Sequence, residues 1–235
     1  MNAMGANFVQ YGYSNTAGNT TFQDSPVLTT HDGSLLVVFA SAGNQFEQVG
    51  PFAVSDGLNT FHRLPLTHFF HGQVFGGTTV EAFYAFNIAA HVGKIRASGW
   101  ANSGGYSQID VAEYSCDGGW GATDPIDTSN NGAGNGTPSV FLSLAQANEL
   151  LVAHIMVNTP ANWAWRQLIS RTGRPGNLIC DPVTAASLGD FQPLLSGGFF
   201  ADGVGGAGSF YVGCAAAFKV PAAPTSSLLQ MGVGR

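Results

Sequence analysis

The first candidate for chemistry is a pair of histidines. His68 and His71 are three positions apart, a spacing that would place both imidazoles on one face of a helix, where they could hold a metal ion. Phe69 and Phe70 between them, and Gly72 after them, favour a strand or loop instead. We therefore interpret this segment as an exposed aromatic loop at an interface or a ligand rim.

The second candidate is a pair of carboxylates. Glycoside hydrolysis needs two of them across a cleft. Glu81 and Glu113 lie on neighbouring predicted strands and could form such a pair, although two acids that face solvent are the simpler interpretation. The sequence has no Gly-x-Ser-x-Gly elbow, no HExxH and no phosphate-binding glycine loop. We expect no catalytic residues and no enzyme, with a jelly-roll glycosidase or lyase as the minor alternative.

Tryptophans are the candidates for ligand binding. Trp163 and Trp165 are two positions apart, so on a strand they would share one face. With Trp120 they could form a flat platform on which sugar rings stack. Packing in the core or at a subunit interface is the alternative for all three.

No cofactor is expected. Asp56 and Asn59 in VSDGLN are predicted to cap a turn by accepting backbone N–H bonds. A structural Ca²⁺ held by these two side chains and a carbonyl is the alternative, because hard cations need several oxygens. Among three cysteines, Cys214 is predicted to be a core thiol, and a bridge between Cys116 and Cys180 is left open.

The composition is poor in charge. Charged residues make up 9% of the 235 residues, against about 25% in an ordinary soluble domain. Charge normally keeps monomers apart, so this chain suits a surface covered by copies of itself or a place outside the cytoplasm. The net charge of −6 and the lack of any Lys/Arg-rich run argue against nucleic acid as a partner. The apolar stretches, of about eight residues, are too short to span a membrane.

Short runs rich in Val, Ile, Phe, Tyr and Thr alternate with Gly, Asn, Asp and Pro, which is typical of strands and turns. In QIDVAEYS, Ile109 and Val111 are predicted to face inward, and Asp110 and Glu113 outward. The predicted strands are 7–13, 34–42, 52–56, 61–66, 79–88, 93–100, 107–115, 139–145, 149–157, 163–170 and 209–220.

These strands, with no convincing helix between them, predict an all-β fold: an antiparallel β-sandwich of the jelly-roll type. Residues 1–220 are expected to form a single domain, with 118–139 as an exposed loop. The tail, 221–235, is expected to be flexible or to dock on a neighbouring subunit. DGSLLVVFA (32–40) resembles ANELLVAHI (147–155); both are interpreted as central strands, with internal duplication as the alternative.

Four segments in order, GSLLVVFASAG, VSDGLNTF, VEAFYAFNIAA and IDVAEYSC, resemble a family of jelly-roll domains found in phage structural proteins and in bacterial secreted or adhesive proteins. The resemblance covers residues 7–220. The sequence differs from the family pattern at Cys116, where the family usually has Gly, and at Phe61, where Trp is common. The resemblance implies a sandwich used for structure, adhesion or sugar contact, and it implies no catalytic residues.

From these observations we expect a structural subunit of a virion or another extracellular assembly: a decoration, fibre or minor capsid protein. The alternative is a carbohydrate-binding or adhesive module, extracellular or on a cell surface, that uses the tryptophans. Expected partners are copies of the chain, as a trimer, together with other virion or surface proteins and glycans. The expected interface residues lie in two segments: His68, Phe69, Phe70 and His71, and Leu228, Leu229 and Met231.

Overall fold

The structure is a computed structural model in which every regular element is a strand and every strand pair is antiparallel, within the residues that it describes. It describes residues 5–18, 20–43, 52–72, 74, 77–100, 105–116, 119–157, 164–165, 169–170, 179–181, 184–191, 196–204 and 210–221. The all-β, antiparallel prediction is confirmed. No helix long and apolar enough to cross a membrane is found in these ranges.

The strands fall into an N-terminal and a C-terminal half. The first half contains β1 (Ala6–Ala17), β2 (Phe22–Asp24), β3 (Leu28–Thr29), β4 (Leu35–Gly43), β5 (Ala53–Ser55), β6 (His62–Arg63), β7 (Phe69–His71), β8 (Thr78–Ala85), β9 (Val92–Gly93), β10 (Arg96–Ser98) and β11 (Tyr106–Cys116). The second contains β12 (Ile126–Asn135), β13 (Ser139–Leu144), β14 (Leu150–Val157), β15 (Ala164–Trp165), β16 (Ile169–Ser170), β17 (Ile179–Asp181), β18 (Thr184–Phe191), β19 (Gly197–Val204) and β20 (Phe210–Phe218).

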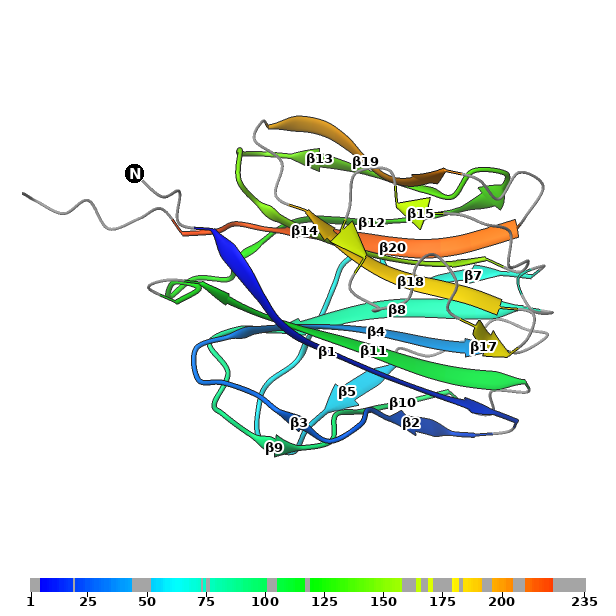
Figure 1. Cartoon of the computed structure of the whole chain (residues 1–235), viewed down its shortest axis with the longest axis horizontal. Helices are drawn as coiled ribbons and strands as arrows, with labels where there is room; N and C mark the ends of the chain where they lie inside the picture. The colour runs from blue at the N-terminus through cyan, green and yellow to red at the C-terminus, as the bar shows by residue number, and fades with distance from the viewer. Residues whose placement is uncertain are drawn as a thin grey trace, which may run out of the picture.

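The sheets stack in four layers that resemble a sandwich (Figure 1). An outer sheet with the order β2-β10-β5 covers a six-stranded sheet with the order β1-β11-β4-β8-β6, in which β7 also pairs with β8. The second half has a six-stranded sheet, β12-β20-β14-β18-β16 with β17 on β18, and an outer sheet, β13-β19-β15. The two large sheets face each other in the middle of the stack, so each is covered on both faces.

Strand β4 shows how the sequence fills two cores at once. Its alternate residues Leu35, Val37 and Phe39 enter the central core between the large sheets. Leu36 and Val38 enter the core between their own large sheet and the small sheet that contains β10. A strand that is covered on both faces has a continuous run of apolar residues in its sequence, and residues 35–40 of β4, LLVVFA, form such a run.

The two halves repeat one topology. β4 and β14 occupy the same place in identically ordered sheets, and so do β11 and β20. Gly33 before β4 and Asn148 before β14 both have positive φ, 76° and 63°. Phe39 and His154, at matching places in the two strands, stack on each other with ring centroids 5.3 Å apart. The two similar segments are thus central strands, and they also hold equivalent positions in a duplicated arrangement.

One predicted loop is a strand. Residues 126–135, within the segment 118–139, form β12, which pairs with β20 at an edge of the second large sheet. The glycines there signal close backbone approach rather than a turn: a Cβ on Gly132 would lie 2.3 Å from the carbonyl oxygen of Ser139. The sequence pattern also missed β18 and β19, and the described residues of the predicted strand 163–170 form β15 and β16, which belong to different sheets. The tail beyond residue 221 lies outside the described residues.

Candidate functional site

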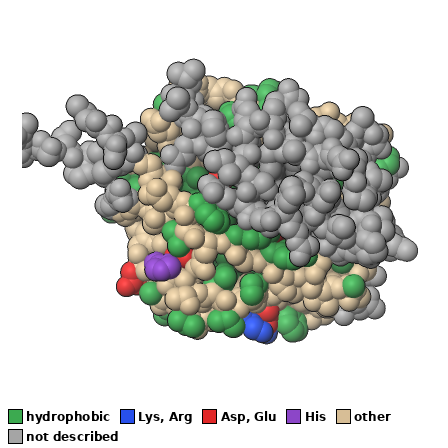
Figure 2. Space-filling view, in the orientation of Figure 1, with side chains coloured by type: hydrophobic (Ala, Val, Ile, Leu, Met, Phe, Trp, Pro, Cys, Tyr) green, Lys and Arg blue, Asp and Glu red, His purple; other side chains and the backbone are tan. Residues whose placement is uncertain are grey.

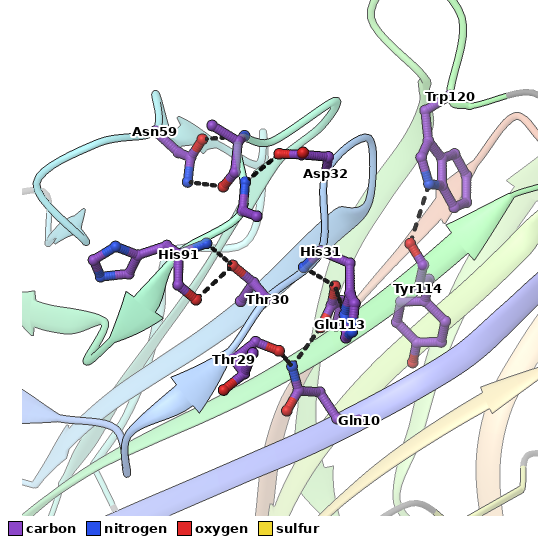
Figure 3. A network of polar contacts seen from close by, with 12 residues as sticks. Gln10, Thr29, Thr30, His31, Asp32, Asn59, His91, Glu113, Tyr114 and Trp120 are labelled. Atoms are coloured by element: carbon purple, nitrogen blue, oxygen red, sulfur yellow. Dashed lines mark hydrogen bonds and ion pairs between the residues drawn. The ribbon is translucent and has the colours of Figure 1, made fainter.

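Trp120 is not available as a sugar-stacking residue. Its side chain is 1% exposed and packs in the central core. Its indole Nε1 donates a hydrogen bond to the carbonyl oxygen of Tyr114, 3.2 Å away (Figure 3). The prediction that Trp120 binds ligand is therefore wrong, because the chain after β11 folds back over the core. Trp163 and the side chain of Trp165 lie outside the described residues.

The histidine segment contains a half-buried strand, which corrects the interpretation of it as an exposed aromatic loop. β7 pairs with β8, and Phe69 packs against the central core. His68 Nδ1 lies 3.1 Å from the Glu81 carboxylate, and the His71 ring lies 5.8 Å from that of Phe210. All four side chains from 68 to 71 are half-buried. Their role at an interface stays a prediction, and Leu228, Leu229 and Met231 lie outside the described residues.

Glu81 and Glu113 are buried rather than solvent-facing, which corrects the simpler interpretation. Each has its own partners. Glu81 accepts a hydrogen bond from the Phe52 amide at 2.8 Å and contacts Arg63 and His68. Glu113 accepts one from the His31 amide at 2.8 Å, lies 3.1 Å from His31 Nδ1 and contacts Gln10 (Figure 3).

The two glutamates do not form a catalytic pair. β8 and β11 lie on opposite sides of β4, where Glu81 pairs with Ala40 and Glu113 with Leu36. Strands are about 4.8 Å apart and rise about 3.4 Å per residue, so this register separates the two Cα atoms by roughly 17 Å. Glycosidase pairs need about 5–9.5 Å.

Asp56 caps its turn as predicted. Its Oδ1 accepts the amides of Leu58 at 2.9 Å and Asn59 at 2.8 Å, and its Oδ2 accepts the Asn59 side-chain amide at 2.7 Å. Burial alone would raise the pKa of Asp56, but these hydrogen bonds outweigh burial and hold the pKa below its usual value. Asn59 Oδ1 in turn accepts the Ala89 amide at 2.8 Å (Figure 3).

This arrangement ties together three loops at one end of the N-terminal half. Two more hydrogen bonds join these loops, in addition to the one between Asn59 and Ala89. Asp32 Oδ1 accepts the Ala90 amide at 2.5 Å, and Thr30 Oγ1 accepts the His91 amide at 3.0 Å (Figure 3). All three side-chain oxygens of Asp56 and Asn59 are engaged inside the protein. No group of three or more His, Cys, Asp or Glu side chains placed for a metal ion is found within the described residues. The arrangement is therefore one that positions loops.

A buried polar cluster that the sequence did not predict lies between the large sheets. Asp110, predicted to face solvent, is 2% exposed. It accepts hydrogen bonds from Tyr11 and, at 2.5 Å, from Gln108. Its Oδ2 lies 3.0 Å from Nε2 of the buried His154 in the opposite sheet, a close contact without the geometry of a hydrogen bond. The only signal in the sequence was a histidine inside the apolar run LLVAHI.

A hydrogen bond also joins the same two sheets. The Tyr114 hydroxyl on β11 donates to Asp190 on β18 at 2.9 Å, and Asp190 is buried.

Burial raises the pKa of the Cys214 thiol, which is 0% exposed in the same central core, so the prediction of a core thiol is confirmed. The side chain of Cys180 lies outside the described residues. These groups are sealed from solvent, so they hold the two halves together rather than forming a site open to a ligand.

Comparison with protein-family models, with curated proteins and with solved structures finds no match for this chain.

Proposed function

We propose that the chain is a non-enzymatic structural subunit of a virion or of another extracellular assembly, such as a decoration, fibre or minor capsid protein. The observation that carries the proposal is the shortage of charge on the surface. Among the residues whose exposure the structure describes, five acidic side chains are buried, so this part of the surface is poorer in charge than the composition indicates. The face in Figure 2 has few charged atoms among its apolar and neutral polar atoms. Such a surface favours contact with other copies.

The outermost sheet of the second half supports the proposal. Phe141 on β13 and Phe200 on β19 are cross-strand neighbours, 43% and 55% exposed, with ring centroids 4.9 Å apart. In the small sheet of the first half, the cross-strand pair Asp24 and Arg96 is an ion pair. The outer sheet of the second half thus presents a pair of neighbouring aromatic rings, and aromatic residues are enriched in protein interfaces.

We also propose that each half is a jelly roll. The support is that, apart from the short strands β3, β6, β7, β9, β16 and β17, successive strands alternate between the large and the small sheet of their half. In the first half β1, β4, β8 and β11 belong to the large sheet, while β2, β5 and β10 belong to the small one. β12, β14, β18 and β20 alternate in the same way with β13, β15 and β19. Jelly rolls are double-sheet folds closed by connections of this kind.

Replacing both Phe141 and Phe200 with Ser is expected to weaken self-association by about thirtyfold or more, because a buried aromatic hot spot is worth about 2 kcal/mol. Light scattering over a dilution series measures the association. Val92→Ser is the matched control, since it removes an apolar side chain that is 70% exposed in the other half. A wild-type chain that stays monomeric at about millimolar concentration would overturn the proposal. Unchanged association in the double variant would remove Phe141 and Phe200 from the interface.

A further inference from the structure

An open groove runs along one edge of the N-terminal half. It has a volume of about 680 Å³, and its eleven lining residues come from β1, from the segment 20–26 that contains β2, and from Lys94. This volume is within the range of about 300–1,000 Å³ that small-molecule sites occupy. The groove is separate from the Asp110–His154 cluster and from the Asp56 turn.

The lining of the groove is rich in hydroxyl groups and nearly neutral. Its charged members are Asp24 and Lys94, whose charges cancel. Thr16 and Thr21 are exposed, and neither side chain bonds another described residue. Hydroxyls both donate and accept hydrogen bonds, so they complement a ligand that carries hydroxyls of its own. The hydroxyl-bearing members are Tyr13, Ser14, Thr16, Thr20, Thr21 and Ser25.

The floor of the groove is held in place by a chain of hydrogen bonds. Gln23, 5% exposed, donates to the Ser14 hydroxyl at 2.8 Å and accepts from Ser107 at 2.9 Å. The Ser107 hydroxyl in turn lies 2.7 Å from that of Thr20, whose carbonyl oxygen accepts the indole N–H of Trp100 at 2.9 Å. A floor fixed before binding lowers the entropy cost of binding a weak, polar ligand.

An aromatic ring stands on the wall of the groove. Phe22 is 44% exposed, and the guanidinium of Arg96 lies 4.1 Å from its ring centroid. Asp24 fixes that guanidinium through two hydrogen bonds, of 2.7 and 3.0 Å, and the bond from Arg96 holds the pKa of Asp24 below its usual value. In Figure 2 a small group of basic atoms beside acidic atoms lies at the lower edge, on the side where β2 and β10 run in Figure 1.

We propose that this groove binds a neutral saccharide, with the face of the Phe22 ring that Arg96 does not cover as a stacking surface and the hydroxyls of Thr16 and Thr21 as direct hydrogen-bond partners. Neutral polyhydroxylated ligands match a lining of hydroxyl groups with no net charge. The amphipathic faces of pyranose rings match an exposed phenyl ring beside polar groups. The site does not involve the tryptophans, and it does not depend on the assembly proposed above.

The test uses the full-length chain on an array of neutral oligosaccharides of two to six hexose units, with sulfated and sialylated oligosaccharides beside them, followed by titration calorimetry on the best probe. The wild-type chain is expected to retain at least one neutral probe. Phe22→Ala and the double variant Thr16→Ala/Thr21→Ala are each expected to weaken binding at least tenfold. Phe141→Ala, which removes an equally exposed phenyl ring from the other outer sheet, is expected to leave binding unchanged.

Three outcomes would overturn the saccharide site. The first is that no neutral probe is retained at millimolar concentration. The second is that binding persists unchanged in the Phe22 and the Thr16/Thr21 variants. The third is that only anionic probes bind and that Lys94→Ala abolishes their binding. Light scattering on Phe22→Ala separates this site from assembly, since the variant is expected to associate as the wild type does.

Discussion

Replacing Asp110 with Ala is expected to destabilise the folded protein by about 3 kcal/mol or more, because each buried hydrogen-bond donor left without an acceptor costs about 1–3 kcal/mol. The substitution leaves the buried His154 facing an apolar gap. It also removes the acceptor that serves Tyr11 and Gln108. Because Asp110 and His154 belong to opposite large sheets, we expect the substitution to weaken the contact between the two halves.

A double-mutant cycle tests whether the cost arises from the pair. His154→Phe places at this position the residue that occupies its equivalent, Phe39, in the first half. The double variant Asp110→Ala/His154→Phe is expected to be more stable than Asp110→Ala, because an apolar replacement of both partners leaves no unpaired imidazole. Urea denaturation at constant pH measures the free energy of unfolding.

The control for this cycle is Asp24→Ala, which breaks the exposed ion pair with Arg96 and is expected to cost less than about 1 kcal/mol. Strictly additive effects of the two core substitutions would show that Asp110 and His154 do not interact. A cost below about 1 kcal/mol for Asp110→Ala would show that the carboxylate is not buried in the folded protein.

The free energy of unfolding is expected to fall as the pH rises from about 4.5 to about 7, through the titration of Glu149. This side chain is fully buried and directly precedes β14. Burial first, and then the neighbouring Asp127, raise its pKa from 4.5 to about 7, although the amide of Gln146, 3.3 Å away, opposes the shift. Lys219 Nζ lies 3.4 Å from Asp127 and also lowers the pKa of Glu149.

The direction of this change in unfolding free energy follows from proton binding. Between pH 4.5 and 7 the folded protein keeps a proton on Glu149 that the unfolded chain has released, so raising the pH favours the unfolded chain. A shift from 4.5 to about 7, at about 1.36 kcal/mol per pH unit, corresponds to a loss of about 3 kcal/mol. The stabilising contribution is fully present below pH 4.5 and is lost as the pH passes through 7.

Glu149→Gln removes this titration while keeping the shape of the side chain. The difference in unfolding free energy between the variant and the wild type is expected to grow in favour of the variant from pH 5 to pH 8, by up to about 3 kcal/mol. Asp127→Asn, which removes the neighbouring charge, is expected to give a smaller change in the same direction. A difference that stays constant with pH would refute the raised pKa of Glu149.

The sequence determined the local structure of this protein. Alternation and apolar runs predicted the all-β fold and strands such as β4, β11 and β14, because a strand places successive side chains on opposite faces whatever lies beyond them. The cap of the Asp56 turn was predictable as well, since its partners Leu58 and Asn59 lie within three residues along the chain.

The tertiary structure decided which faces are covered. Asp110 and Glu113 looked solvent-facing beside Ile109 and Val111, but a second large sheet covers one face of β11 and the small sheet and its loops cover the other. Trp120 looked like a surface residue in a polar segment, and the glycine-rich β12 looked like a loop. Periodicity along one strand shows that its two faces differ. Whether each face meets water or another sheet depends on distant segments: in this protein the large sheet of the other half covers one face of each large sheet, and the small sheet of the same half covers the other.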